Sequence, residues 1–207
     1  MKAFITGTDT GVGKTFATAL LTRALRRAGL DTVALKPLCC GGREDVEILR
    51  GAADNELTCD EINPVWMRTP VAPLVASRKE GIPVSIEALA SWFQQITRDR
   101  QSYLVEGAGG WLVPVADHLT VADLAAKLGL PVILVVANRL GCINHTLLTL
   151  ENIRARGLKC DGIILNTTSP NLDDAMQTNR EILIETSGVP VLVEIGPEQK
   201  SLDLAVV

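Results

Sequence analysis

The residues best suited to chemistry lie near the N-terminus, where positions 7–15 read GTDTGVGKT. A strand-like run precedes this stretch and a helical one follows it, which is the setting of a phosphate-binding loop. Backbone N–H groups would face phosphate oxygens, Lys14 would reach the β- and γ-phosphates, and the Thr15 hydroxyl would ligate Mg²⁺. The strict pattern has glycine where Thr8 stands, and here Gly7 comes one step earlier. The loop predicts a site for a nucleoside triphosphate and Mg²⁺.

A carboxylate ends a later strand-like run. Glu106 closes the run 102–106 and precedes a glycine cluster, Gly107, Gly109 and Gly110. A carboxylate at the tip of a strand beside a phosphate loop can hold Mg²⁺ directly or through water. The glycines would let the backbone approach a nucleotide closely. The alternative is an ordinary strand-ending turn with a solvated glutamate.

Two more charged residues have two open interpretations each. Lys36 ends the run 31–36, where it would add positive charge near the γ-phosphate. A lysine at a strand end is also often a solvated edge charge. Asp45 lies at the start of a helical stretch, where it is either a favourable charge at the helix N-terminus or a third Mg²⁺ ligand.

Strand-like and helical stretches alternate along the chain. The predicted strands are 2–7, 31–36, 102–106, 132–136, 162–166 and 189–194. The predicted helices are 13–28, 44–53, 86–98, 121–128, 143–155 and 172–186, and residues 56–78 are predicted to be irregular. Continuous apolar runs such as VILVV at 132–136 are typical of parallel strands buried on both faces. We therefore predict one α/β domain over residues 1–207, with a doubly wound, mainly parallel sheet and helices on both faces.

Composition narrows the classes of partner. The net charge is −4, aromatic residues make up 3% and no basic run occurs, which argues against nucleic acid or an anionic membrane as the main partner. The longest apolar stretch, 128–137, is too short to cross a bilayer. Five cysteines without a CxxC motif favour a reducing cytoplasm over a disulfide framework. The vicinal pair Cys39 and Cys40 is predicted to be buried or site-lining, and Trp66 and Trp92 are predicted to be packing residues.

Four motifs together carry a family resemblance. They are GTDTGVGKT at 7–15, KP at 36–37, VEGAGGWLVP at 105–114 and PVILVVANRLGCINHTLLT at 131–149. In this combination and order the chain resembles the dethiobiotin synthetase family over nearly its whole length. The resemblance implies a P-loop NTPase fold and a cytoplasmic homodimer. It also implies that MgATP and CO₂ are used to close the ureido ring of dethiobiotin on 7,8-diaminononanoate, through a carbamate and a carbamic–phosphoric mixed anhydride.

The resemblance also implies roles for single residues. The implied Mg²⁺ ligands are Thr15, Asp45 and Glu106, and the implied catalytic residues are Lys14 and Lys36. The implied nucleotide-binding residues are Thr10, Gly11, Val12, Gly13, Lys14, Thr15, Asp45, Glu106, Gly107, Gly109, Asn166, Gly196, Pro197 and Glu198. The implied substrate-binding residues are Thr10, Lys36, Cys40, Gly141, Cys142 and Asn144, the last three at a helix start that would hold the substrate carboxylate across the dimer interface.

The chain departs from the family pattern at three places. Cys40 stands where many relatives have serine, and a thiol is the weaker hydrogen-bond donor. The stretch 37–45 is shorter than in many relatives. Gly196 and Pro197 stand where many relatives have Pro-Trp, which bears on nucleotide preference.

Three other functions remain open at this point. An ATP-dependent amidoligase of the same fold usually carries a glutaminase domain, for which we expect no room in 207 residues. A partitioning or positioning switch ATPase has a lysine near the start of the phosphate loop, where this chain has Asp9. A paralogue that has lost its activity is the third.

Overall fold

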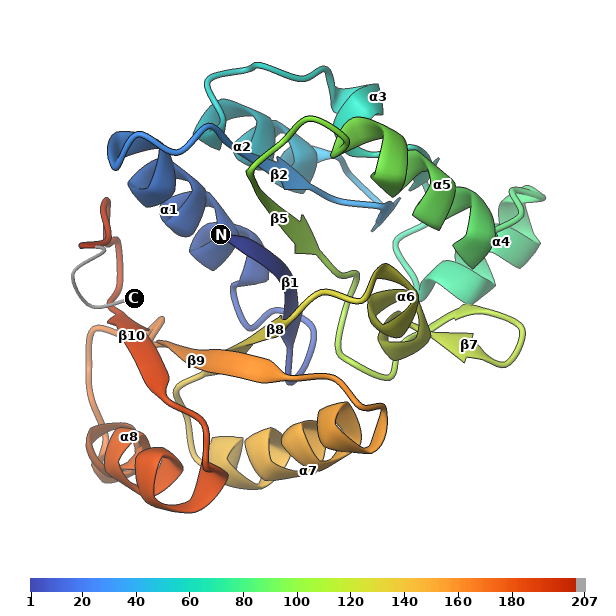
Figure 1. Ribbon diagram of the computed structural model, residues 1–207. Helices are drawn as coiled ribbons and strands as arrows, with labels where there is room; N and C mark the ends of the chain where they lie inside the picture. Colours follow the sequence, from blue (N-terminus) through green and yellow to red (C-terminus); the bar gives the residue numbers. More distant parts are fainter. Residues whose placement is uncertain (204–207) are drawn as a thin grey trace.

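The computed structural model describes residues 1–203, and a six-stranded parallel sheet lies at its centre (Figure 1). The strand order is β10-β9-β8-β1-β5-β2. The strands are β1 (Lys2–Gly7), β2 (Thr32–Leu35), β5 (Ser102–Glu106), β8 (Val132–Ala137), β9 (Cys160–Asn166) and β10 (Val191–Ile195). The predicted doubly wound parallel sheet is confirmed. The last four residues of the predicted domain, 204–207, lie outside the described residues.

Helices cover both faces of this sheet. They are α1 (Lys14–Arg27), α2 (Glu44–Ala52), α3 (Cys59–Ile62), α4 (Pro73–Glu80), α5 (Ile86–Ile96), α6 (Val121–Leu128), α7 (Cys142–Ala155) and α8 (Asp174–Ser187). Successive strand side chains point to opposite faces, so Phe4 of β1 joins one apolar cluster and Ile5 joins the other. Helix α1 packs on the Ile5 side, whereas α5, α6, α7 and α8 contribute to the Phe4 side. Figure 1 shows α7 and α8 next to each other below β9 and β10.

The prediction of irregular chain over residues 56–78 is wrong for much of its length. Helix α3 begins there with a capping box between Thr58 and Glu61. The strand β4 (Val65–Met67) then pairs in parallel with a short strand after β2, β3 (Leu38–Cys40). Pro73 occupies the first turn of α4 instead of breaking it, because a helix has no hydrogen bond to lose at that position. Another small ribbon, β6 (Pro114–Ala116) with β7 (Leu119–Thr120), follows the glycine cluster.

The strand order brings the predicted site residues to one edge. Strand β5 lies between β1 and β2, with Glu106 opposite Ile5 and Leu35 opposite Val105. The phosphate loop after β1, the carboxylate at the end of β5 and Lys36 directly after β2 therefore meet at the carboxyl edge.

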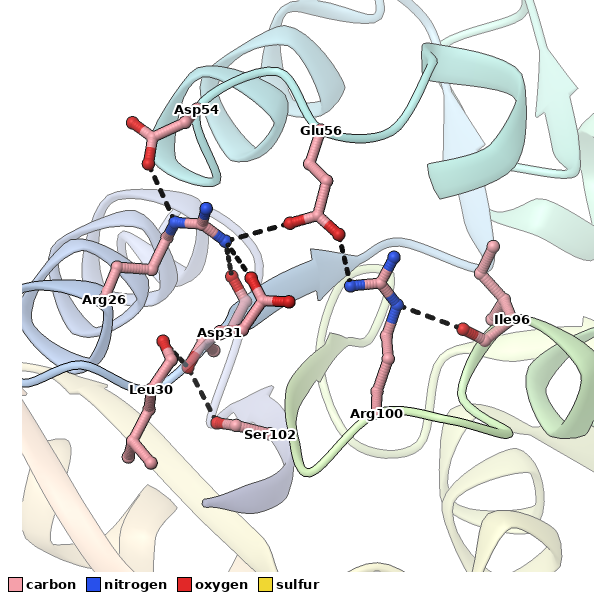
Figure 2. A network of polar contacts seen from close by, with 9 residues as sticks. Arg26, Leu30, Asp31, Asp54, Glu56, Ile96, Arg100 and Ser102 are labelled. Carbon is pink, nitrogen blue, oxygen red and sulfur yellow. Dashed lines mark hydrogen bonds and ion pairs between the residues drawn. The ribbon is translucent and has the colours of Figure 1, made fainter.

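The opposite edge of the sheet carries a network of ion pairs (Figure 2). Arg26 of α1 contacts Asp31, Asp54 and Glu56 at 2.9, 2.9 and 3.1 Å. Glu56 also lies 2.6 Å from Arg100, which precedes β5. The network ties α1 to the segments that follow α2 and α5, and it leaves the carboxyl edge to other residues. No helix within residues 1–203 is both long enough and apolar enough to cross a membrane.

Candidate active site

Lys36 lies between two carboxylates at the carboxyl edge of the sheet. Its Nζ is 2.6 Å from Glu106 Oε1 and 2.7 Å from Asp45 Oδ2. The Thr15 hydroxyl donates to the same Glu106 oxygen at 2.8 Å. Lys36 is 4% exposed and Glu106 is 0% exposed, so neither is a solvated edge charge. Four predicted residues from the phosphate loop, β5, α2 and the end of β2 thus form one cluster.

Burial and opposite charge set the protonation of this cluster. Burial alone would lower the pKa of Lys36, but Glu106 and Asp45 outweigh it and raise that pKa above its ordinary value. For Lys14, burial outweighs the attraction of Glu106 and lowers the pKa. Burial raises the pKa of Asp45, but Lys36 outweighs that effect and holds it below the usual range. At neutral pH the cluster therefore presents the Lys36 ammonium group and an ionised Asp45 carboxylate.

The oxygen atoms of the cluster fit Mg²⁺. The buried Glu106 Oε2 has no hydrogen-bond partner among the described residues, and such an orphaned acceptor calls for a ligand. Thr15 and Asp45 add a hydroxyl and a second carboxylate, which are oxygen ligands of the type that Mg²⁺ prefers. Asp45 also lies in the first turn of α2, so both interpretations made from its sequence position agree with the geometry.

The fold of the phosphate loop explains why a glycine stands at position 7, one residue before the place that the strict motif requires. A Cβ on Gly7 would meet the Val12 side chain at 2.6 Å, so Gly7 occupies the point where the loop folds back on itself. Gly13 has φ of 87°, a left-handed conformation that favours glycine, and it precedes the first turn of α1. Lys14 Nζ donates to the Asp9 carbonyl at 3.1 Å and closes the loop.

A pocket of about 740 Å³, which we call the β9 pocket, lies next to the phosphate loop. It is lined by Gly13, Phe16, Asn166, Thr167, Thr168, Pro170, Gly196, Pro197 and Glu198. The Asn166 amide donates to the Val12 carbonyl at 2.9 Å and so joins the pocket to the loop. The structure thus brings the residues predicted for adenine together. The prediction missed Phe16, Thr167, Thr168 and Pro170. A phenylalanine directly after the GKT triplet was a usable signal in the sequence.

A second cavity, of about 640 Å³, contains the Lys36 cluster, and we call it the central cavity. Its predicted lining residues are Thr10, Gly11, Gly13, Lys14, Thr15, Lys36, Cys40, Asp45, Glu106 and Gly109. Burial raises the pKa of the Cys40 thiol to about 11, so this side chain is uncharged at neutral pH. Residues 70–73 form another wall of the central cavity. The sequence did not predict this wall, because the prolines in residues 56–78 indicated irregular chain.

Several predicted residues lie outside the central cavity of this chain. A Cβ on Gly107 would meet Val121 and Phe4 of the apolar core, so this glycine faces the core. Gly141 has φ of 89° and precedes α7, whose first residue, Cys142, is buried and whose exposed Asn144 follows. The second half of α7, from Leu148 to Ala155, borders a third hollow of about 790 Å³, the α7 groove. The α7 groove is lined by Thr8, Asp9, Gly110, Trp111, Leu112, Val113, Pro114, Leu148, Thr149, Glu151, Asn152 and Ala155.

Comparison with known proteins decides the family. A family model described as "AAA domain" matches residues 2–203. The ATP-dependent dethiobiotin synthetase BioD of Akkermansia muciniphila is 42% identical over 207 residues, covering 100% of this chain and 97% of its own. The chain belongs to the dethiobiotin synthetase family. A second family member, from Aromatoleum aromaticum, is 41% identical over 197 residues, covering 91% of this chain and 87% of its own.

Solved structures agree on the fold of this dethiobiotin synthetase family member. The MinC:MinD cell division protein complex of Aquifex aeolicus matches with a TM-score of 0.62 and 15% identity, over 96% of this chain and 81% of that one. The septum site-determining protein MinD of Pyrococcus horikoshii, complexed with Mg-ADP, matches with a TM-score of 0.59 and 19% identity, over 96% and 82%. At these identities the likeness shows the P-loop NTPase fold alone. The dethiobiotin synthetase relatives do not favour the alternative of a switch ATPase.

Proposed function

We propose that this protein is an ATP-dependent dethiobiotin synthetase, a ligase that closes the ureido ring on 7,8-diaminononanoate with CO₂. One observation carries the proposal, namely that Lys36 lies buried between Glu106 and Asp45 beside the phosphate loop. The central cavity next to this cluster has room for a small diamine, and the β9 pocket has room for a nucleobase. MgATP is thus the co-substrate, with its triphosphate spanning the two sites.

The chemistry needs positioning and charge more than a covalent nucleophile. One substrate amine takes up CO₂ and becomes a carbamate, with loss of a proton. The carbamate oxygen attacks the γ-phosphorus, which releases ADP and gives a carbamic–phosphoric mixed anhydride. The second amine attacks the carbonyl carbon, the bond to the phosphate oxygen breaks, and phosphate and a proton leave. Lys14 and Lys36 stabilise the negative charge on the phosphoryl and carbamate oxygens.

Thr15, Asp45 and Glu106 would hold Mg²⁺. When bound there, the ion would neutralise negative charge on the phosphate oxygens, as in other phosphoryl-transfer enzymes. Glu106 is positioned for this by its place in β5 and by the Thr15 hydroxyl. Asp45 is held by its ion pair with Lys36, so ligand and lysine fix each other's place.

We also propose a homodimer whose partner subunit supplies the site for the substrate carboxylate. Exposed apolar side chains lie along α7 and its groove, with Leu140 before the helix 83% exposed and the groove residues Leu148 and Leu112 58% and 51% exposed. Exposed apolar patches of this kind mark interaction sites. The N-terminus of α7 suits an anion, yet its residues Gly141, Cys142 and Asn144 do not line the central cavity of their own chain. In a dimer formed through this surface, the start of α7 of one subunit would contribute to the substrate site of the other.

We place the enzyme in the cytoplasm. All five cysteines lie within the described residues and are free thiols. Free thiols of this number persist in reducing compartments.

The test of the function is direct. The protein is mixed with 7,8-diaminononanoate, isotopically labelled bicarbonate and MgATP, and the product is analysed by mass spectrometry. Labelled dethiobiotin together with one ADP per product supports the proposal. ATP hydrolysis without dethiobiotin would instead favour a switch ATPase, and no turnover at all would favour a paralogue that has lost its activity.

A further inference from the structure

The short loop between β3 and α2 leads into the first turn of α2, which carries Asp45 of the Lys36 cluster. We call Gly41, Gly42 and Arg43 the glycine loop. Cys40 precedes it and Asp45 follows it by two residues, so the path of the glycine loop decides where the Asp45 carboxylate lies relative to Lys36. A segment with two glycines is flexible by itself, and a 2.7 Å contact between Asp45 and Lys36 requires that it be fixed.

Trp66 of β4 fixes the first residue of the glycine loop. Its indole Nε1 donates to the Gly41 carbonyl at 2.8 Å, and the Gly41 N–H donates to the Met67 carbonyl at 2.9 Å. Gly41 has φ of 88°, and a Cβ there would meet Pro70 Cβ at 3.1 Å. Both polar groups of the Gly41 backbone are therefore used, in a conformation that favours glycine.

Trp66 also supports the last residue of the glycine loop. The Arg43 guanidinium carbon lies 4.9 Å from the centre of the Trp66 ring, within the range of a cation–π contact. The same guanidinium donates to the carbonyls of Cys59 at 2.9 Å and Asn63 at 3.3 Å. Arg43 precedes the first turn of α2, which carries Asp45. One side chain of β4 thus holds both ends of the glycine loop.

We propose that Trp66 is a positioning residue for the reaction. It acts through Gly41 and Arg43 to set Asp45 against Lys36 and the Mg²⁺ site, and this inference rests on the proposed role of that site. The triphosphate and the base contact other elements, the phosphate loop and the β9 pocket. Loss of the Trp66 contacts should therefore reduce metal binding and turnover and leave the affinity for the nucleotide base nearly unchanged.

The chain offers a matched control in Trp92 of α5. Its indole Nε1 also donates to a backbone carbonyl, that of Glu61, at 3.1 Å. Among residues 1–203, Trp92 forms no hydrogen bond or cation–π contact with the glycine loop. Trp66→Phe and Trp92→Phe each remove one such hydrogen bond and keep an aromatic ring. Both should lower the thermal midpoint to a similar small extent.

The experiment compares these two variants with the unchanged protein. Binding of Mn²⁺ in the presence of ADP is followed by electron paramagnetic resonance, and kcat and KM are measured with MgATP. For Trp66→Phe we expect a several-fold weaker Mn²⁺ affinity and about a tenfold lower kcat, with KM for ATP changed less than about twofold, since small displacements of catalytic groups cost rates of this order. Trp92→Phe should match the unchanged protein in Mn²⁺ affinity, kcat and KM. Equal Mn²⁺ affinity and equal kcat in the two variants would overturn the proposal.

A second pair of variants applies if Trp66→Phe fails to fold. Arg43→Lys keeps the charge but cannot stack flat on the ring and donate to two carbonyls at once. Arg68→Lys is its control, because Arg68 lies 5.6 Å from the same ring, outside the glycine loop. Only Arg43→Lys should weaken Mn²⁺ binding, and equal behaviour of the two would contradict the proposal. Because Mn²⁺ binding needs no diamine, a failure to make dethiobiotin would refute the proposed function without deciding the role of Trp66.

Discussion

At the scale of single residues, the two ion pairs of Lys36 affect both the stability of the protein and the charge at the proposed active site. Glu106 is fully buried, and its carboxylate is stabilised there by hydrogen bonds from the Lys36 ammonium and the Thr15 hydroxyl. A buried ion pair is weak evidence for net stability, but removal of one partner leaves a buried charge without compensation. The site is therefore expected to be sensitive to single substitutions and more tolerant of paired ones.

Lys36→Met should lower the free energy of unfolding by about 3 kcal/mol in Mg²⁺-free buffer, because the Glu106 carboxylate is left unpaired. It should also lower kcat by about 10²-fold or more, because a charge near the transferred phosphoryl group is lost. The double variant with Glu106→Gln should recover most of the stability and none of the activity. Urea unfolding and steady-state rates measure both effects. A Lys36→Met protein as stable as the unchanged one would contradict this account.

The two cavity lysines should differ in their response to alkaline pH. The pKa of Lys14 is lowered below 10.5, so stability rises slightly with pH as that group discharges in the folded state. The pKa of Lys36 is raised above 10.5, so its stabilisation is complete below 10.5 and is lost only as pH rises through the higher folded value. As pH rises toward 10.5, affinity for ADP should therefore fall before the Lys36 pair is lost.

Calorimetric titration with ADP across this pH range measures the effect. Lys14→Met should bind ADP more weakly and with a smaller dependence on pH. Lys36→Met should keep a pH dependence but move it to higher pH, because the Lys36 charge helps to lower the pKa of Lys14. If Lys14→Met keeps the full slope, another group is responsible.

At the scale of elements, α1 connects the nucleotide site to the opposite edge of the sheet, with a left-handed glycine near each end. Gly13 has φ of 87° and Gly29 has φ of 86°. A Cβ on Gly13 would meet Asn166 Nδ2 at 2.1 Å, whereas a Cβ on Gly29 would meet nothing within 4 Å. A side chain at either position would strain the backbone, but only a side chain at Gly13 would also collide with Asn166.

Gly13→Ala and Gly29→Ala should each destabilise the protein by roughly 1–2 kcal/mol, the cost of a left-handed conformation for alanine. Only Gly13→Ala should also raise KM for ATP, by about tenfold or more, because it displaces Asn166 from the β9 pocket. Thermal unfolding and KM values separate these effects. Equal KM values in the two variants would show that the Asn166 contact does not matter for nucleotide binding.

At the scale of the whole molecule, the exposed leucines around α7 call for a partner. Leu148→Asp places a charge on the proposed dimer surface, where it cannot be buried without cost. We expect dissociation to a monomer in analytical ultracentrifugation and a raised KM for 7,8-diaminononanoate, with the unfolding temperature of the monomer little changed. Leu30→Asp, at the half-exposed end of the α1–β2 connection, is the control and should leave the oligomer intact. A Leu148→Asp protein with an unchanged sedimentation coefficient and KM would remove this surface from the interface.

The sequence by itself determined the parallel sheet and the residues at its carboxyl edge. The predicted strands contain continuous apolar runs, which are typical of parallel strands. Because parallel strands end at the same edge of the sheet, the sequence alone predicted that residues 7–15, Lys36 and Glu106 lie near one another. The family could also be predicted, because its motifs are local and lie in a fixed order. The assignment of roles to these residues stays a prediction until the variants are measured.

Only the tertiary structure decided how these residues are held. The pairing of β3 with β4, the wall formed by residues 70–73 and the contacts of Trp66 join segments more than twenty residues apart. Such pairings leave no periodic pattern in short strands, and the prolines between 64 and 73 imitate an irregular chain. The charge state of Lys36 likewise depends on burial and on two carboxylates from other elements, which no local pattern encodes.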